Sequence, residues 1–286
     1  MTAEEEIKQL GIQRGAELVG IAKVSDINKY APACHRPDDI LLGAKSVIVF
    51  AGRQTTRGAW RSPAYESFFA SLDFMRIRYG ISLAVAKLIE SKYGYYCLAD
   101  IPPPVGLNPS LSLKLCAEMA GLGTRSMAGG VVLNAKFGAL NFAACVTTMP
   151  LKADGQIKEK VCPHPSCVKL WKKRRTTACL EACPECLSGE IEGKKIKWMR
   201  YDRRICFTRA QTLNPGSFER MLLEASEEPD SVKRKSMLLG SFSRNALQAL
   251  ANSITSAQCA ECLRNCPICL QARTLKGKIG KLVKER

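Results

Sequence analysis

The strongest constraint on the fold is a pair of matching cysteine runs in the second half of the chain. Each run has the form C-x3-C-P, and the two runs end at Cys183-Pro184 and at Cys266-Pro267. A Cys-Pro pair closes the cysteine run of bacterial ferredoxins, which bind two 4Fe-4S clusters. The sequence therefore predicts that this half of the chain folds around iron-sulfur clusters.

Eight cysteines form the predicted ligand set. In ferredoxin runs the fourth cysteine binds the other cluster, so the two runs exchange one ligand. This rule assigns one cluster to Cys162, Cys167, Cys179 and Cys266. It assigns the other cluster to Cys206, Cys259, Cys262 and Cys183. Clusters that exchange ligands must lie close together, so they would form a short path for electrons.

Other uses of these thiols stay open. Two zinc sites would need the same eight cysteines, although structural zinc is usually held by paired C-x2-C runs without a closing proline. Disulfides are disfavoured in a reducing cytosol. Cys186 and Cys269 follow the two Cys-Pro pairs at the same offset. Each is therefore either a substitute ligand or a buried structural thiol.

The first half has a different character, because it holds only four of the 14 cysteines and mixes strand and helix patterns. Strands are predicted at 16–24, 45–52, 95–99, 131–134 and 140–148, and helices at 3–14, 65–93 and 111–119. The glycine turn at 121–130 lacks the third glycine of a dinucleotide fingerprint and follows a helix, so a Rossmann site is disfavoured. These patterns predict an α+β domain at 1–155 and a cluster domain at 156–286 that ends in a basic tail.

Length and charge limit the class of protein. A chain of 286 residues with 46% hydrophobic content has enough apolar surface for a large core. We expect a cytoplasmic protein, because the acidic start "MTAEEEIKQL" does not read as a signal peptide and no apolar run suits a membrane span. A formal net charge of +17 indicates an anionic partner.

Several segments resemble one group of proteins. They are "AGLGTRSMAGGVVLNAKFGALNFAACVTTMPL", "CLEACPECLSGEI", "YDRRICFTRAQT" and "CAECLRNCPI". Their order and content resemble epoxyqueuosine reductases and reductive dehalogenases, including the Asp-x-Arg-x-Cys form of the lone ligand Cys206. The resemblance spans most of the chain, and its second half is the more specific part.

The resemblance implies a nitroreductase-like domain that binds cobalamin, followed by a ferredoxin-like module with two 4Fe-4S clusters that reduces the cobalt. The implied corrinoid contacts are Gly121, Gly123, Ser126, Met127, Phe137 and Gly138. Neither His35 nor His164 lies in the D-x-H-x-x-G motif that replaces the lower base of cobalamin, so the corrinoid is expected base-off without a histidine ligand. Asp100, in "LADIPPP", is the candidate general acid, or else an ordinary loop aspartate.

One departure from the family affects the function. Epoxyqueuosine reductases usually continue Gly-Leu-Gly with Trp-x-Gly-Lys, whereas this chain has "TRSM". Three hypotheses follow: a cobalamin-dependent reductase, a corrinoid reductase or handling protein, and a ferredoxin-like electron carrier. The expected partner is an acidic donor such as ferredoxin or flavodoxin, then tRNA or a corrinoid protein, with no membrane. Basic stretches that interleave Trp171, Trp198 and Tyr201 with Lys and Arg suit either phosphates or an acidic protein.

Overall fold

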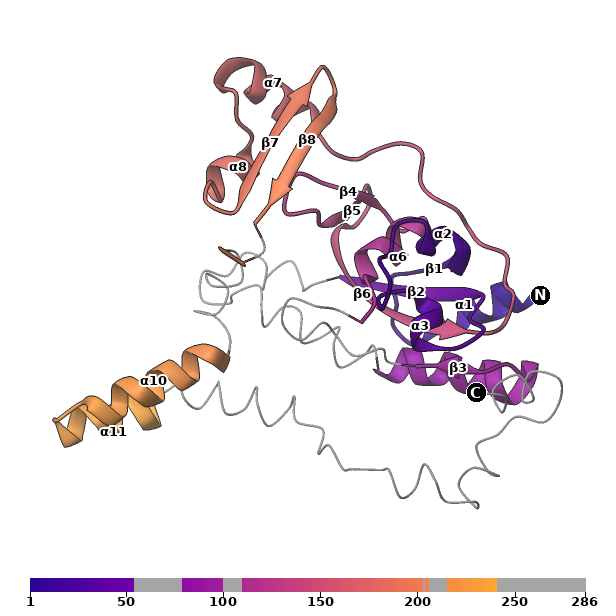
Figure 1. Ribbon diagram of the computed structural model, residues 1–286, viewed down its shortest axis with the longest axis horizontal. Coiled ribbons are helices and arrows are strands. Elements are labelled where there is room, and N and C mark those ends of the chain that lie inside the picture. The colour runs from indigo at the N-terminus through magenta and orange to yellow at the C-terminus, as the bar shows by residue number, and fades with distance from the viewer. Residues whose placement is uncertain (54–78, 100–109, 203, 206–214, 241–286) are drawn as a thin grey trace. The chain divides into compact units, whose positions relative to one another are not determined.

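The described residues belong to two compact units. The computed structural model describes residues 1–53, 79–99, 110–202, 204–205 and 215–240 (Figure 1). One unit includes residues 1–202, and the other lies within residues 203–274. The predicted domain boundary between residues 155 and 156 falls inside the first unit and stays a prediction.

The first unit is built on a six-stranded sheet in which the strands pair antiparallel. Its strands are β1 (Leu18–Lys23), β2 (Ser46–Arg53), β3 (Cys97–Leu98), β4 (Thr124–Arg125), β5 (Val132–Asn134) and β6 (Gly138–Thr147). The strand order is β1-β2-β6-β5-β4, and β3 also pairs with β6. The strand β1 therefore lies at one edge.

Both faces of the sheet are buried. Along β2, Val47 and Val49 pack on one face, while Ile48 and Phe50 pack on the other, as the two-residue period of a strand requires. The first face is covered by α2 (Val24–Asn28) and α6 (Leu113–Met119). The second face is covered by α1 (Ala3–Gln13) and by a helix at 79–88 that continues into the π-helical turn η1 (Ile89–Tyr93). A short helix, α3 (Pro37–Ile40), precedes β2.

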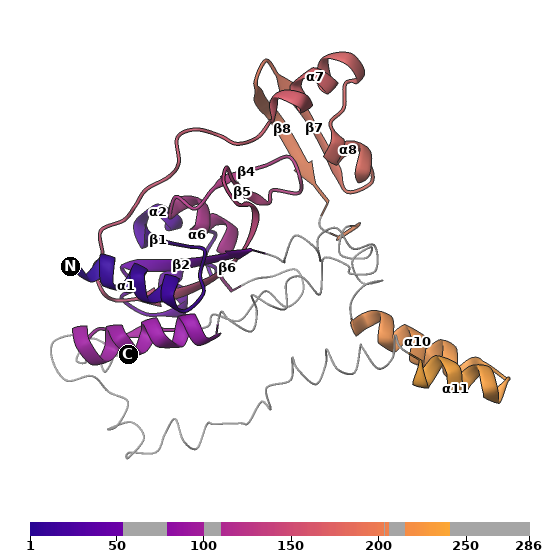
Figure 2. The ribbon, with the colours of Figure 1, turned by 180° about the vertical axis from the view of Figure 1, so that it is seen from behind.

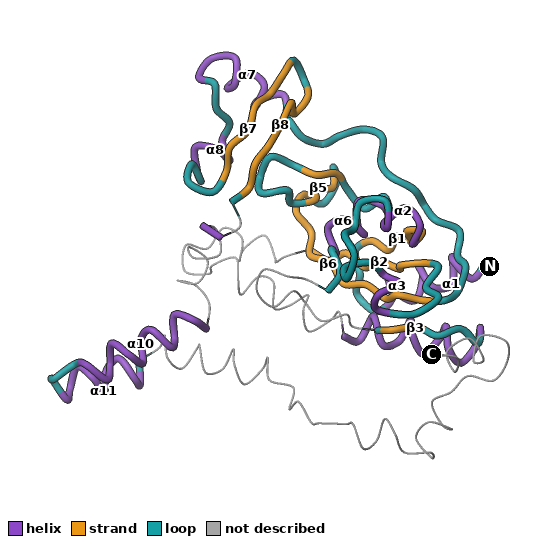
Figure 3. The backbone as a smooth tube through the Cα atoms, in the orientation of Figure 1, coloured by secondary structure: helices purple, strands orange, loops and turns teal. Residues whose placement is uncertain are grey.

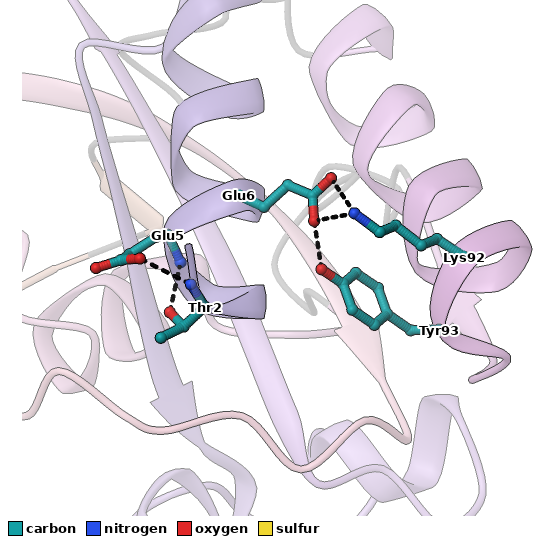
Figure 4. Close-up of polar contacts among 5 residues, drawn as sticks. All are labelled: Thr2, Glu5, Glu6, Lys92 and Tyr93. Atoms are coloured by element: carbon teal, nitrogen blue, oxygen red, sulfur yellow. Dashed lines mark hydrogen bonds and ion pairs between the residues drawn. The ribbon is translucent and has the colours of Figure 1, made fainter.

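Polar contacts hold α1 against the end of η1 (Figure 4). Thr2 and Glu5 form a capping box that satisfies backbone N–H groups at the start of α1. The carboxylate of Glu6 accepts hydrogen bonds from Lys92 Nζ at 2.6 and 2.7 Å and from the hydroxyl of Tyr93. Lys92, with Tyr93, holds the pKa of Glu6 below its ordinary value. These bonds join two helices that the sequence separates widely.

The cysteine-bearing part of the first unit follows β6 through a long loop (Figure 3). It consists of α7 (Pro165–Arg174), α8 (Ala178–Ala182), β7 (Leu187–Glu192) and β8 (Lys195–Tyr201), in which β7 and β8 form an antiparallel hairpin. The second unit contributes a helical pair, α10 (Pro215–Glu227) and α11 (Ser231–Leu239), visible from both sides (Figures 1 and 2). Asp230 caps α11 by accepting hydrogen bonds from Val232 N and Lys233 N.

The predicted mixture of helices and strands in the first half is confirmed. Observed elements match the predicted segments at 3–14, 16–24, 45–52, 95–99, 111–119, 131–134 and 140–148. The predicted helix at 65–93 is described from residue 79 and ends at Gly94, whose φ of +72° suits glycine. The part at 65–78 lies outside the described residues. The nitroreductase-like and ferredoxin-like architectures stay predictions.

Three cysteines of the first half are core residues. Cys97, Cys116 and Cys145 are buried, whereas Cys34 is exposed. Burial raises the pKa of Cys116 to about 12, so its thiol stays neutral at physiological pH. These thiols act as small hydrophobic side chains. None of the helices in the described ranges combines the length and apolar character that a membrane crossing requires.

Gly20 allows α6 to approach the sheet, and its replacement should destabilise the fold. A Cβ at Gly20 would lie 2.3 Å from the carbonyl oxygen of Ala120 and 2.9 Å from Leu122 Cδ2. We expect Gly20→Ala to lower the free energy of unfolding by about 1–3 kcal/mol, because a backbone oxygen has to move. Chemical denaturation measures this loss.

Gly80→Ala is the matched control. Gly80 lies in the helix at 79–88, and no atom lies within 4 Å of a Cβ built there. Its free energy of unfolding should rise by about 0.4–1 kcal/mol, because alanine restricts the unfolded chain. Equal effects of the two substitutions would show that α6 does not pack against β1 as described.

Candidate metal centre

The loop after β6 is fixed to the edge of the sheet by Asp154. The Asp154 carboxylate accepts a hydrogen bond from Ile21 N at 2.7 Å, and Asp154 N donates to Ile21 O at 2.9 Å. Lys8 forms an ion pair with the same carboxylate. Two residues earlier, Lys152 N donates to Glu4 Oε1 at 2.9 Å, and this bond holds the pKa of Glu4 below its ordinary value. The edge strand β1 therefore determines the course of the loop.

Further contacts guide the loop to the first cysteine of the predicted set. Gly121 adopts a φ of +70°, and a Cβ there would lie 2.5 Å from the carbonyl oxygen of Gly155. Val161 N donates to Thr124 Oγ1 at 3.1 Å. Because Cys162 directly follows Val161, β4 places it beside the turn that continues from Thr124.

Cys162 lies close to two other predicted ligands. Its sulfur interacts with the backbone N–H of Met127, which favours the thiolate. Burial is the main reason that the pKa of Cys162 is raised, and the nearby thiols of Cys179 and Cys167 raise it further. Three of the four cysteines predicted for one cluster are therefore close enough to interact.

Helix α7 carries Cys167 in its first turn. The chain enters α7 through His164, whose Nδ1 accepts a hydrogen bond from Ser166 N at 3.3 Å, and through Pro165 at the first helical position. A thiolate in the first turn is favoured by the positive end of the helix dipole. The local sequence therefore suits Cys167 to an anionic role.

Cys179 lies at the start of α8, beside a hydroxyl group. The Sγ of Cys179 is 3.2 Å from Thr177 Oγ1, and Thr177 is buried. A thiolate at Cys179 would accept a hydrogen bond from this hydroxyl. Cys162 and Cys179 thus each have a donor close to their sulfur.

A small apolar cluster, here called the Trp171 cluster, surrounds these sulfur atoms. It consists of the buried residues Met127, Trp171 and Ile191, against which pack Cys162, Cys179, Val168, Leu180 and Ile196. The indole Nε1 of Trp171 is buried and has no hydrogen-bond partner among the described residues. A buried N–H without an acceptor is uncommon and costs about 1–3 kcal/mol.

The hairpin of β7 and β8 packs against the turn at 126–131. A Cβ at Gly189 would lie 2.8 Å from Met127 Cε. A Cβ at Gly129 would lie 3.5 Å from the Tyr201 ring, and one at Gly130 would lie 3.3 Å from Met199 Cε. Glycines on both sides permit this close approach. The turn therefore contacts both Cys162 and the hairpin.

The structure places the six residues predicted to contact a corrinoid in two different environments. A Cβ at Gly123 would lie 2.5 Å from Leu133 O, Gly121 approaches the loop, and the Ser126 hydroxyl donates to Val131 O at 2.8 Å. Met127 belongs to the Trp171 cluster, so these four positions serve internal packing.

The other two predicted contacts, Phe137 and Gly138, lie in a different environment. Phe137 is half-buried at the edge of the core, and Gly138 is exposed, with no atom within 4 Å of a Cβ built there. Corrinoid contact by the six residues stays a prediction.

The remaining predicted ligands are only partly described. Cys183 is half-buried at the end of α8, where its N–H donates to Cys179 O at 3.1 Å, and Cys186 is buried. Among the described residues, no three Cys, His, Asp or Glu side chains are grouped closely enough to hold a single metal ion. The other predicted site residues lie outside the described ranges, namely Asp100, Cys206, Cys259, Cys262 and Cys266.

Three features of the centre are absent from the sequence prediction: the Met127 N–H, the Thr177 hydroxyl and the burial of Trp171. The sequence carries a signal for the last of these, since Trp171 follows Cys167 by four residues and so lies on the same side of a helix. The basic residues around Trp171 favoured the opposite interpretation, an exposed ring. Trp198 does fit that interpretation, because it is 47% exposed.

Comparisons with known proteins give weak matches. No protein-family model and no curated protein matches the sequence. A solved epoxyqueuosine reductase with an epoxyqueuosine-modified tRNA stem loop matches at 16% identity and a TM-score of 0.42, covering 58% of this chain and 50% of its own. The epoxyqueuosine reductase from Streptococcus thermophilus matches at 16% identity and a TM-score of 0.44, covering 68% and 55%.

A catabolic reductive dehalogenase in complex with 3-bromo-4-hydroxybenzoic acid matches at 17% identity and a TM-score of 0.46, covering 87% of this chain and 35% of its own. The chain thus spans about half the length of the epoxyqueuosine reductases that it matches. These are the two families that the sequence motifs resemble.

Proposed function

We propose that this protein is an iron-sulfur oxidoreductase that passes electrons through two 4Fe-4S clusters to a base-off cobalamin. The observation that supports the proposal is that Cys162 and Cys179 both pack against the Trp171 cluster, while Cys167 lies near enough to raise the pKa of Cys162. These are three of the four cysteines that the ferredoxin-like spacing assigns to one cluster. Bound clusters would supply one-electron transfer, and a bound corrinoid would supply the reductive chemistry.

The residues present suit an anionic, sulfur-rich group. Cys167 lies at a helix N-terminus, Cys162 interacts with the N–H of Met127, and Cys179 lies beside the Thr177 hydroxyl. Each of these neighbours stabilises negative charge on sulfur. The apolar side chains of the Trp171 cluster would exclude water from the same sulfur atoms.

The turn at 126–131 is the proposed link between the thiols and the first domain. Met127 contacts Cys162 and also follows Ser126 in the segment that resembles a corrinoid-binding stretch. Gly138 is the member of the proposed corrinoid contacts that internal packing leaves open, whereas Phe137 packs partly against the core. Asp100 is proposed as the proton donor on its sequence context alone.

A second candidate function follows from the packing of the turn. Ser126 is bonded to Val131, and Met127 is buried against the hairpin, so both side chains have a structural role. Side chains that are engaged in packing are not available to contact a corrinoid, which favours a protein that does not hold its own cobalamin. The alternative is therefore a corrinoid reductase or electron carrier without its own substrate. Cobalamin binding by the purified protein, measured by absorbance, sets the electron carrier apart, since a carrier would bind none, whereas a cobalamin-dependent reductase and a corrinoid reductase would both bind it.

Substitution of single cysteines tests the cluster assignment. Anaerobically reconstituted wild-type protein should contain about eight irons per chain, as two 4Fe-4S clusters require. We expect Cys162→Ser and Cys179→Ser each to lose about half of this iron, because each removes a ligand from the same cluster. Iron and sulfide analysis with visible spectroscopy measures the loss.

Cys116→Ser is the control for a cysteine buried in the sheet core, and it should keep its iron. Cys186→Ser tests the buried cysteine that is not among the eight predicted ligands. Retention of iron in this variant would assign Cys186 a structural role. Stoichiometric zinc in place of iron in the wild-type protein would refute the proposed function.

The proposed partner is an acidic electron donor such as a ferredoxin or flavodoxin. Exposed basic side chains are concentrated on α7 and the hairpin, namely Lys172, Lys173, Arg174, Arg175, Lys194, Lys195, Lys197 and Arg200. Some are balanced by acids, as Lys197 is by Glu190 at 3.3 Å. The segment that carries the proposed cluster thus also carries the charge that would attract an acidic protein. Phosphate groups of tRNA and an acidic corrinoid protein are the other anionic partners.

Charge reversal tests the donor. We expect the double substitution Lys172→Glu, Lys173→Glu to slow the reduction of this protein by an acidic ferredoxin about tenfold at low ionic strength. The two negative charges would weaken the electrostatic attraction that brings the two proteins together. The control, Lys23→Glu with Lys87→Glu, makes the same charge change at exposed positions of the first domain. Stopped-flow absorbance measures the rates. Equal slowing by both pairs, or no effect of added salt, would argue against docking at α7.

A further inference from the structure

Among the described residues, the indole N–H of Trp171 lacks an acceptor, and it lies in the apolar cluster against which Cys162 and Cys179 pack. Trp171 is 8% exposed, and its Nε1 is fully buried without a partner among the described residues. Burial of such a group is unfavourable unless something accepts its hydrogen bond. The position of Trp171 therefore indicates a missing acceptor.

Helix geometry places the ring near the sulfur atoms. Trp171 follows Cys167 by four residues on α7, so the two side chains lie on one side of the helix. Aromatic side chains on a helix lean toward its N-terminus, which is where Cys167 lies. The contacts of Cys162 and Cys179 with the Trp171 cluster bring two further sulfur atoms to the same place.

The rest of the Trp171 cluster offers no strong acceptor. Ile191, Val168, Leu180 and Ile196 are hydrocarbon side chains, and Met127 has only a weakly accepting thioether. The cysteine sulfur atoms are different, because a thiolate or a cluster sulfide is anionic and accepts hydrogen bonds. Sulfur is thus the acceptor that the chemistry of this cluster favours.

We propose that the Trp171 indole N–H donates a hydrogen bond to a sulfur atom of the iron-sulfur cluster held by Cys162, Cys167 and Cys179. This inference rests on the proposed function, and it makes Trp171 a positioning residue that tunes the cluster. Hydrogen bonds to cluster sulfur atoms raise the reduction potential, since they stabilise the more negative reduced state. Trp171 would therefore make this cluster easier to reduce.

Redox titration of Trp171→Phe tests the inference. Phenylalanine keeps an aromatic ring but lacks the N–H, so the reduction potential of one cluster should become more negative while the iron content stays at the wild-type value. The matched control is Trp198→Phe. The Trp198 indole is exposed and donates to Glu190 Oε2 at 3.0 Å, so its loss should leave both potentials unchanged.

A measurement on the unsubstituted chain covers the case in which Trp171→Phe fails to fold. Wild-type protein and a Trp60→Phe, Trp198→Phe double variant, whose one remaining tryptophan is Trp171, are labelled with indole ¹⁵N, reduced and examined by electron-nuclear double resonance. A ¹⁵N coupling to the cluster is expected in both proteins. Its absence, or an unchanged potential in an iron-loaded Trp171→Phe protein, would overturn the inference. Failure of the wild-type protein to bind iron would instead overturn the proposed function.

Discussion

The two hydrogen bonds between Asp154 and Ile21 determine how the two halves of the first unit are connected. They satisfy the N–H and the carbonyl of Ile21 at the edge of β1, where no further strand pairs in the part of the chain that the structure describes. The loop that follows reaches β4 through Val161 and delivers Cys162 to the backbone of Met127. The six-stranded sheet therefore determines the position of Cys162, the first cysteine of the predicted ligand set.

The environment of the thiols combines apolar side chains with hydrogen-bond donors. The Trp171 cluster supplies the apolar part, and Met127 N–H, the Thr177 hydroxyl and the start of α7 supply the donors. The donors favour negative charge on sulfur, whereas burial opposes it, and burial has the larger effect on the pKa of the Cys162 thiol. The proposed cluster would place iron next to these sulfur atoms, and a metal ion stabilises the thiolate against burial.

The sequence predicted five of the six strands of the sheet and the helices that match α1, η1 and α6, because apolar periodicity and turn residues mark them. It did not predict α2, α3 or β4, which are too short to show a period. It also selected Cys162, Cys167 and Cys179 by spacing, and in the structure the thiols of Cys167 and Cys179 lie near enough to Cys162 to raise its pKa, but the ligand set stays a prediction. Trp171 and Thr177 were not predicted, because their roles depend on contacts between α7, α8 and the hairpin. The packing of Ser126 and Met127 could not be predicted either, because the sequence of a glycine-rich turn does not show which side chains point inward.

The ligand assignment proposed from the sequence implies two clusters that exchange ligands and so lie close together. Electron paramagnetic resonance of the anaerobically reconstituted, fully reduced protein tests this most directly. Two neighbouring reduced 4Fe-4S clusters should give a broadened spectrum with spin coupling, integrating to about two spins per chain. A spectrum from a single isolated cluster, or a diamagnetic protein that contains zinc, would show that the cysteine runs do not form the proposed pair.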